Sequence, residues 1–418
     1  MSKIPLNEFI TLQRGFDLPS NKRISGNVPV VASTGIAGYH NEIKVKAPGV
    51  VIGRSGSIGG GQYIEKDFFP LNTTLYVKDF KGHYPRFIYY LLKSIDFTSF
   101  NVGTGVPTLN RNHLSSILIS DLGIDKEKEI AYILGSLDQK IQLNIQINQT
   151  LEQIAQALFK SWFVDFDPVR AKVQALSDGL SLEQSELAAM QTISGKTPEE
   201  LTALSQTQPD RYAELVETAK AFPCEMVEVD GVEVPKGWEL STIGDCYDVV
   251  MGQSPKGETY NENKQGMLFY QGRAEFGWRF PTPRLFTTDP KRIAEQNSIL
   301  MSVRAPVGDI NIALEKCCIG RGLAALQHKS KSLSFGLYQI QSIKPELDLF
   351  NGEGTVFGSI NQANLKNIQI INPDEKFIQL FEKYLSSCDS KIMNNEIENN
   401  ALKEIRDLLL PRLLSREI

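Results

Sequence analysis

The sequence predicts an α+β protein: two globular domains with mixed sheets, separated by a long antiparallel helical coiled-coil pair and related by a pseudo-twofold internal repeat. Three observations predict this fold. Residues recur at a fixed offset, two stretches carry a heptad pattern, and short apolar runs bounded by glycine and proline fill the remainder. The expected divisions are domains at 1–125 and 236–372, spacer helices at 126–163 and 373–418, and a connector at 164–235.

The repeat is visible in residues that recur 251 positions later, from Asn110 to Asn361 and from Asp138 to Asp389. Upstream the match continues with small changes of offset, as loops of unequal length produce. Gly53–Gly59 parallels Ser302–Gly308, each after an apolar run, and Gln13-Arg14-Gly15 parallels Val250-Met251-Gly252. Because so many positions agree, the chain is interpreted as domain, helix, connector, domain, helix.

Each domain is expected to contain short strands with a helix beside them. In the first domain the apolar runs at Val28–Ala32, Val50–Ile52 and Leu75–Val77 predict strands, and Arg86–Ile95 predicts a helix. The run Ile299–Met301 is the counterpart of Val50–Ile52 in the second domain. A glycine-rich turn after such a strand suits a tight bend or a close approach to a ligand.

The spacer helices follow from apolar residues that alternate spacings of four and three, which is a coiled-coil seam. Both copies of the seam carry two asparagines, Asn144 and Asn148 in the first and Asn395 and Asn399 in the second. A seam asparagine costs stability but penalises shifted registers. Antiparallel pairing places Asn144 and Asn148 opposite Asn399 and Asn395. The alternative is two unrelated amphipathic helices, each packed on its own domain.

Helix length suggests a spacing function, because ~37 helical residues at a rise of ~1.5 Å reach ~55 Å. Two domains related by a twofold axis, about one turn of DNA (~34 Å) apart or somewhat more, suit two half-sites on one face of a duplex. The geometry therefore suggests a split recognition sequence.

Composition and charge bound the function. The chain has 418 residues, 41% of them hydrophobic, and no apolar run near the ~20 residues that span a bilayer. We expect a cytoplasmic protein with no membrane partner. The five cysteines form no CxxC pair and have no histidine at zinc-site spacing, so they are interpreted as reduced and structural.

The net charge of −5 is unevenly distributed. Residues 164–235 contain 5 basic and 14 acidic side chains, whereas 1–125 has 13 basic and 9 acidic and 236–372 has 15 and 13. Two mildly basic domains therefore flank an acidic helical connector, which permits DNA binding without demonstrating it. We expect the connector to lie away from a duplex; contact with a partner subunit is the alternative.

Two globular repeats, each followed by a long helix in this register, resemble the specificity subunit of type I restriction-modification systems over nearly the whole chain. Further landmarks are Leu158–Arg170 at the end of the first helix and Val234-Pro235-Lys236-Gly237-Trp238 before the second domain. The first domain departs from this pattern, since Ile4-Pro5-Leu6 stands where the second has Gly-Trp.

The resemblance implies that each repeat is a target-recognition domain for one half of a bipartite double-stranded DNA site. It also implies two modification subunits, adenine methyltransferases that use S-adenosylmethionine, and restriction subunits with motor and nuclease activity in the full complex. No cofactor, metal or catalysis is expected in this chain. Accordingly, the sequence has no Asn/Asp-Pro-Pro-Tyr-like motif and no P-loop, and Asn372-Pro373-Asp374 is interpreted as a helix start.

Base recognition needs donors and acceptors on elements that enter a groove, with arginine for guanine and asparagine or glutamine for adenine. The candidates lie at matched positions of the two domains. In the first domain they are Lys22, Arg23, Ser33, Thr34, Gly35, Tyr39, His40, Arg54, Asn101 and Thr104. In the second they are Ser254, Lys256, Gln271, Arg273, Arg279, Arg284, Arg304, Asn351 and Thr355.

Simpler interpretations stand beside these candidates. Any single lysine or arginine can be a solvated surface charge, and Arg54 and Arg304 can cap strand ends. The histidines have no partner spacing, which favours structural or surface positions. At the level of the whole chain, a two-domain protein-binding scaffold with a coiled-coil spacer is the main alternative, and an enzyme with its site between the repeats is the third. A steep loss of binding between ~50 and ~200 mM salt favours DNA over a protein partner.

Overall fold

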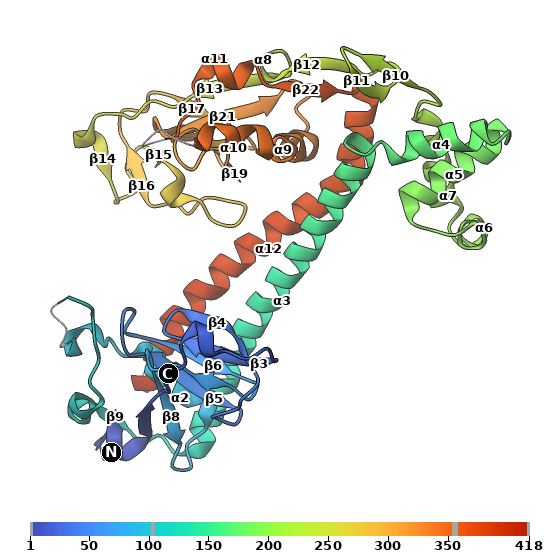
Figure 1. The fold of residues 1–418 in the computed structure, drawn as a ribbon. Coiled ribbons are helices and arrows are strands. Elements are labelled where there is room, and N and C mark those ends of the chain that lie inside the picture. Colours follow the sequence, from blue (N-terminus) through green and yellow to red (C-terminus); the bar gives the residue numbers. More distant parts are fainter. Residues whose placement is uncertain (1–2, 102–104, 353–357, 416–418) are drawn as a thin grey trace. The chain divides into compact units, whose positions relative to one another are not determined.

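The structure is a computed structural model that describes residues 3–101, 105–352 and 358–415 (Figure 1). The chain forms two compact units. Unit 1 contains residues 1–147 with 394–418, and unit 2 contains 148–393. Two long helices, α3 (Ile124–Phe163) and α12 (Glu375–Ser415), each contribute residues to both units.

Unit 1 is built on two sheets and a short strand pair. The four-stranded antiparallel sheet has the order β2 (Thr11–Arg14), β8 (Thr74–Asp79), β5 (Gly49–Gly53), β6 (Gly59–Ile64). The three-stranded sheet has the order β4 (Gly35–His40), β3 (Val28–Ala32), β7 (Phe69–Pro70), and β3 pairs with β7 in parallel. β1 (Lys3–Pro5) pairs with β9 (Leu118–Ser120). The short helices are α1 (Leu6–Phe9) and α2 (Pro85–Ser94), and the 3-10 turns are Ser20–Lys22, Thr98–Phe100 and Arg111–Ser116.

The core of unit 1 explains why β5 is buried along its whole length. Val50 and Ile52 belong to the cluster formed with α2 and the first turns of α3, whereas Val51 packs with Val31 and Phe68 on the opposite face. A strand covered on both faces needs a continuous apolar run rather than an alternating one. That is the pattern that the sequence has at this position.

Unit 2 repeats the same plan with larger loops. Its four-stranded sheet has the order β13 (Tyr247–Met251), β21 (Leu323–His328), β18 (Ile299–Ser302), β19 (Ile310–Ile312). Its five-stranded sheet has the order β14 (Tyr260–Asn261), β16 (Leu285–Thr287), β15 (Met267–Tyr270), β20 (Cys317–Ile319), β17 (Ile293–Ala294). β12 (Glu239–Thr242) pairs with β22 (Gln369–Asn372). The helices are α8 (Ile243–Cys246), α9 (Leu333–Ser342), α10 (Lys344–Asp348) and α11 (Gln362–Lys366). The 3-10 turns are Gly257–Thr259, Arg273–Glu275 and Leu349–Asn351.

Hydrogen bonds repeat with the fold. The amide of Leu109 donates to Arg54 O at 2.8 Å, and at the matched position the amide of Ile360 donates to Val303 O at 3.0 Å. Gly15 and Gly252 are equivalent too, because a side chain at either residue would collide with a carbonyl oxygen, that of Leu71 or of Gly320. The predicted internal repeat is therefore confirmed at the level of single contacts.

The predicted elements are confirmed as well. β3 covers Val28–Ala32, and β5, β8 and α2 cover the other three predicted elements to within a few residues. Both units have mixed sheets, since β3 pairs with β7 and β15 with β20 in parallel. Among the described residues, no helix combines the length and apolar character that a membrane span requires.

The acidic connector folds into four helices and a hairpin (Figure 1). The helices are α4 (Asp167–Ser177), α5 (Leu182–Ser194), α6 (Pro198–Thr207) and α7 (Pro209–Ala221), and the hairpin is β10 (Met226–Val229) with β11 (Val232–Pro235). Leu201, Leu204 and Leu215 form part of a small apolar core. Lys172 is buried and donates to Ala219 O at 3.0 Å and Phe222 O at 2.7 Å, which satisfies carbonyls at the end of α7.

His328, at the end of β21, makes the stability of unit 2 depend on pH. The ring is buried against Tyr247 and Phe335, and its Nδ1 accepts from the amide of Ser330 at 3.2 Å. Burial, and secondly the charge of Lys329, lowers the pKa of His328 from 6.5 to about 4. Between these values the unfolded chain binds more protons than the folded one, so stability is complete above pH 6.5 and falls as the pH approaches 4.

We expect wild-type protein to lose about 2.5 kcal/mol more than a His328→Gln variant between pH 7 and pH 4.5, because each unit of pKa difference corresponds to about 1.4 kcal/mol. Urea unfolding of both proteins at several pH values measures this difference. Between pH 7 and 8 the two curves should run parallel. Equal losses in wild type and variant at pH 4.5 would show that His328 does not carry the effect.

Candidate DNA interface and helix pair

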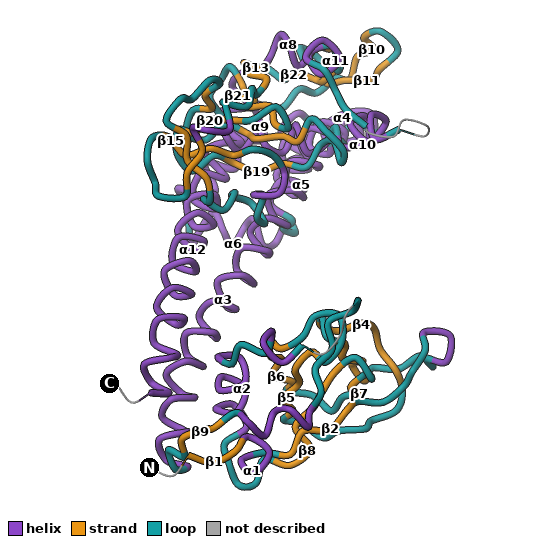
Figure 2. Tube along the Cα trace, turned by 90° about the vertical axis from the view of Figure 1, so that its left-hand side faces the viewer, coloured by secondary structure: helices purple, strands orange, loops and turns teal. Residues whose placement is uncertain are grey.

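In both units the segments of α3 and α12 run side by side and antiparallel (Figure 2). In unit 1, Asn144 Nδ2 donates to Asn399 Oδ1 at 3.0 Å and to Glu398 Oε2 at 2.7 Å, and both asparagines are buried. The prediction that Asn144 lies opposite Asn399 is confirmed. In unit 2, Asn148 is also buried and donates to Ile392 O at 3.4 Å. A polar layer of this kind resists a shift of register, since a shifted amide would face aliphatic side chains.

A charged cluster fastens α2 to the helix pair in unit 1. Asp138 accepts from Arg406 Nη1 at 2.8 Å and from the hydroxyl of Tyr90 at 2.6 Å. Burial, and secondly the bond to Asp138, raises the pKa of Tyr90 far above its ordinary value, so the hydroxyl remains a donor. One carboxylate thus joins three elements, α2, α3 and α12.

The corresponding cluster in unit 2 contains a residue predicted to contact DNA. Arg279 is only 6% exposed and forms ion pairs with Glu152 of α3 and Asp389 of α12. Tyr338 of α9 donates to Glu152 at 3.2 Å. Burial by itself lowers the pKa of Arg279, but Asp389, Tyr338 and Glu152 together raise it above its ordinary value, so the guanidinium stays charged. Because the guanidinium is enclosed by these partners, the structure removes Arg279 from the set of side chains that can enter a groove.

Aromatic side chains surround the C-terminal end of α3. Trp162 has its ring centroid 5.1 Å from that of Phe222 and 5.5 Å from that of Tyr384, and Phe163 stacks on Trp238 at 5.6 Å. The two sequence landmarks, Leu158–Arg170 and the segment ending at Trp238, therefore meet in one core. They hold α3, α12, the connector and the second domain together within unit 2.

In the first domain, several of the predicted DNA-contact residues lie on the hairpin formed by β3 and β4. Ser33 and Thr34 form the turn, Gly35 has a φ of 124°, and Tyr39 is 56% exposed. Lys22 is exposed on the preceding 3-10 turn.

Two other candidates near this hairpin support it. Arg23 is half-buried and its Nη1 donates to Ala37 O at 2.5 Å, which braces β4. His40 is buried and its Nδ1 accepts from the amide of Ile24 at 3.0 Å, so it holds the chain rather than facing outward.

The remaining first-domain candidates surround the end of β5. Arg54 is half-buried and donates to Asn72 O at 3.3 Å, and the Asn101 side chain accepts from the amide of Thr108 at 2.9 Å. Asn101 is exposed, whereas Thr104 lies outside the described residues.

In the second domain, the exposed candidates are Lys256, Gln271, Arg273, Arg284 and Arg304. Two of these arginines form ion pairs: Arg273 with Asp309, and Arg284 with the buried Glu275 at 2.9 Å. The side chains of both remain 56% exposed and can still reach a ligand. The ion pairs restrain the guanidinium end of each side chain.

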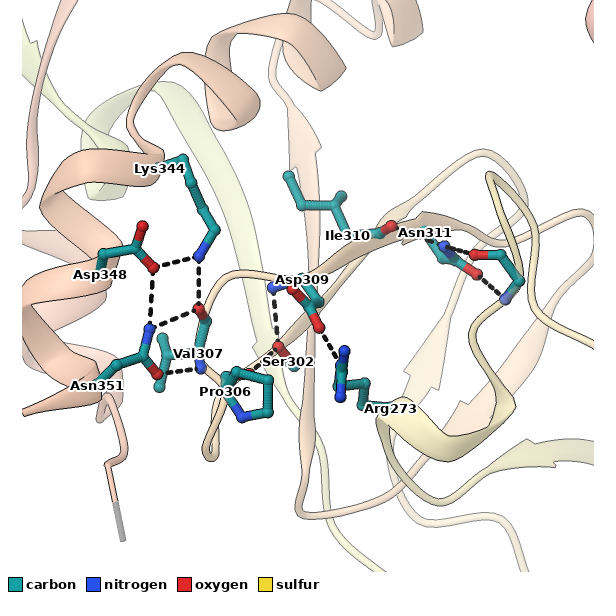
Figure 3. A network of polar contacts seen from close by, with 11 residues as sticks. Arg273, Ser302, Pro306, Val307, Asp309, Ile310, Asn311, Lys344, Asp348 and Asn351 are labelled. Carbon is teal, nitrogen blue, oxygen red and sulfur yellow. Dashed lines mark hydrogen bonds and ion pairs between the residues drawn. The ribbon is translucent and has the colours of Figure 1, made fainter. Parts of the chain in front are cut away.

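Asn351 has a structural position (Figure 3). Its Oδ1 accepts from the amide of Val307 at 2.6 Å, and its Nδ2 donates to Val307 O at 3.2 Å and Asp348 Oδ1 at 3.0 Å. Nearby, Ser302 Oγ accepts from the amide of Asp309 at 2.9 Å. These bonds hold the turn that carries Arg304. Thr355 lies outside the described residues.

The loops after three strands meet in unit 2. Ser254 Oγ accepts from the amide of Arg321 at 3.3 Å, and the amide of Gly320 donates to Tyr270 O at 2.8 Å, next to Gln271. At the matched place in unit 1, Asn72 donates to Asp17, which also accepts from Arg14 at 3.1 Å. Arg14, Asn72 and Arg321 are therefore additional candidates. The internal repeat could have indicated Asn72 and Arg321 from the sequence, because they follow corresponding strands of the two domains.

An exposed aromatic residue and a polar cluster were not predicted from the sequence. Trp278 is 49% exposed beside the buried Arg279, and the sequence could have indicated it as an aromatic residue in a glycine-containing loop.

His83, Asp121 and Glu127 lie close enough together to hold a cation. His83 Nδ1, however, is already 2.6 Å from Glu127 Oε1, so a hydrogen-bonded pair accounts for the cluster more simply.

Comparison with known proteins identifies the family. The profile described as "Type I restriction modification DNA specificity domain" matches residues 1–153 and 235–404. The chain is 42% identical over 397 residues to the "Type I restriction enzyme HindI specificity subunit" of Haemophilus influenzae, covering 86% of this chain and 84% of that protein. It is 36% identical over 190 residues to the "Putative type I restriction enzyme MjaX specificity subunit" of Methanocaldococcus jannaschii, covering 44% of each chain.

The fold is found in a solved structure as well. The type I restriction-modification S subunit from M. genitalium superposes with a TM-score of 0.60 at 15% identity, covering 99% of this chain and 95% of that one. Two family matches flank the connector in the sequence, as two repeats require. The chain therefore belongs to the type I restriction-modification DNA specificity family, as a non-catalytic specificity subunit with two DNA-recognition domains.

Proposed function

We propose that each recognition domain reads one half of a bipartite target in double-stranded DNA, and that the halves are separated by a fixed unspecified gap. The observation that carries this proposal is that the same two loops are bonded to each other in both domains, by the side chains of Asn72 and Asp17 in the first and by the Arg321 amide and Ser254 Oγ in the second. Loops at matched strand ends, with exposed basic and amide side chains nearby, suit base edges and phosphates. The proposed domain limits are 1–125 and 236–372.

The proposed contact set is smaller than the sequence alone suggested. Arg279 and His40 are left out because they are buried and bonded within the protein. The exposed side chains retained are Lys22, Thr34, Tyr39, Asn101, Lys256, Gln271, Arg273, Arg284 and Arg304, with Ser33, Arg54 and Ser254 half-exposed beside them. Arg23 and Asn351 are proposed to support the loops that carry these contacts.

We further propose that the helix pair binds two modification subunits, and that restriction subunits join the full complex. Apolar side chains remain exposed on both helices although the seam itself is filled. Those most exposed are Tyr132, Leu143, Ile154, Ile397 and Leu408. Exposed apolar residues along a helix are common at sites of protein association. The same residues also suit the alternative, a protein-binding scaffold that makes no contact with DNA.

Selection from random duplex DNA at physiological salt, using the complex of this chain with its modification subunit, tests the proposal. Enrichment of two short blocks at a fixed spacing is the expected result. A complex that forms but enriches no sequence would contradict DNA reading and favour the scaffold. A single enriched block would show that only one domain reads DNA.

A further inference from the structure

Arg279 lies in the loop between β15 and β16, which also carries the exposed Trp278 and two partly exposed arginines, Arg273 and Arg284. An arginine with 6% exposure in a surface loop is unusual, because the charged head normally remains in water. Here the head inserts between the helices, where Glu152 and Asp389 approach it from α3 and α12. The loop is thereby tied to both helices.

The matched cluster in unit 1 shows what is different about this arrangement. Asp138 and Asp389 are equivalent, 251 positions apart, and Tyr90 and Tyr338 occupy corresponding helices, α2 and α9. In unit 1 the cation is Arg406, which belongs to α12 itself. The residue 251 positions before Arg406 is Ala155, which is 1% exposed. In unit 2 the helix therefore lacks its own arginine, and a loop of the recognition domain supplies the cation.

The rest of the loop is held within the second domain, where Phe276 and Phe280 pack against apolar clusters and Arg273 pairs with Asp309. Gly277 exchanges two hydrogen bonds with the Asn311 side chain, at 3.0 and 3.1 Å, and the amide of Ile312 donates to Arg279 O at 2.9 Å. A pocket of about 210 Å³ beside the loop is lined by Trp278, Arg279 and residues of α3, β19 and α9. The Arg279 ion pairs join this loop to α3 and α12, so the position of the loop relative to the two helices depends on them.

We propose that Arg279 is a positioning residue for DNA specificity: it anchors the loop that carries Trp278, Arg273 and Arg284 to the helix pair, and so fixes how the second domain meets its half-site. This inference rests on the proposed function of the second domain as a DNA reader. Ala155 occupies the position in α3 that corresponds to Arg406, so the helix provides no cation of its own there. The first domain has no such anchor at the matched position, because Arg406 satisfies Asp138 within the helix pair.

Selection from random duplex DNA, with the same complex, compares wild type with three variants. Arg279→Ala should reduce discrimination in the second half-site by about 10- to 100-fold at one or more positions, the usual value of one or two base contacts. The first half-site should be unchanged. Arg406→Ala is the matched control, since it removes the equivalent cation without releasing a loop, and it should leave the second half-site intact.

The double variant Ala155→Arg with Arg279→Ala separates anchoring from charge balance. It places the arginine on the helix, as in unit 1, and should restore the melting temperature that Arg279→Ala lowers, yet leave the second half-site relaxed. Restored discrimination in the double variant, or full discrimination in folded Arg279→Ala, would overturn the inference. If Arg279→Ala does not fold, the double variant provides the same comparison. A wild-type complex that enriches no split motif would instead count against the proposed function.

Discussion

Trp162→Ala is expected to lower the free energy of unfolding of unit 2 by about 3–5 kcal/mol, the largest stability effect of any change proposed for this chain. The indole is fully buried at the end of α3 and contacts rings from α12 and from Phe222, directly after α7 in the connector. Its removal leaves a cavity where three segments of the chain meet, and such a site cannot collapse without moving a helix. Urea unfolding followed by circular dichroism measures the change.

Two variants serve as controls for Trp162. Trp162→Phe should cost much less, because a ring remains and the indole N–H, which has no partner among the described residues, is removed. Trp278→Ala should change stability by less than about 0.5 kcal/mol, since Trp278 is half-exposed. Equal losses for Trp162→Ala and Trp278→Ala would show that the aromatic core at the end of α3 does not stabilise unit 2.

DNA affinity of the complex is expected to fall by about 10³–10⁵-fold between ~50 and ~200 mM salt, as six to ten phosphate contacts produce. Modification subunits add DNA contacts of their own, so the informative quantity is the difference in salt dependence between wild type and each variant. Lys22→Gln and Lys256→Gln, one in each domain, should each reduce the slope of log affinity against log salt by about 1, because each removes one phosphate contact.

Lys220→Gln is the control for the salt experiment. Lys220 is an exposed lysine of the connector, paired with Glu217 at 3.2 Å, in the acidic segment proposed to lie away from the duplex. Its slope should match that of wild type. Binding that does not weaken with salt, or a slope that changes equally in all three variants, would argue that these domains do not contact phosphates and would favour the scaffold.

The internal repeat and the helix register could be predicted from sequence because both depend on periodic or repeated positions. Asn144 and Asn399 stand out as amides in an apolar seam, and their pairing follows once the helices are antiparallel. The strand Val28–Ala32 was predictable because it is an apolar run that ends at a turn. Such signals are local, or are copied at a constant offset, and need no knowledge of packing.

Side-chain burial could not be predicted in the same way. Arg279, His40 and Asn351 belong to residue types that favour DNA contact, yet each is bonded to other groups of the protein. Their partners lie 110, 16 and 44 positions away in the chain, and no short-range pattern indicates such a pairing. The connector shows the same limit, because its acidic composition concealed a small apolar core built from Leu201, Leu204 and Leu215.

The unequal origin of the two arginines constrains the construction of chimeric subunits. A foreign domain grafted in place of residues 236–372 without an arginine equivalent to Arg279 would leave Glu152 and Asp389 with no cation between them, next to the small Ala155. Conversely, the second domain transplanted to the first position would bring its loop arginine to a place that Arg406 already fills. An exchange of recognition domains in this protein should therefore include the helix residue at the matched position, Ala155 or Arg406.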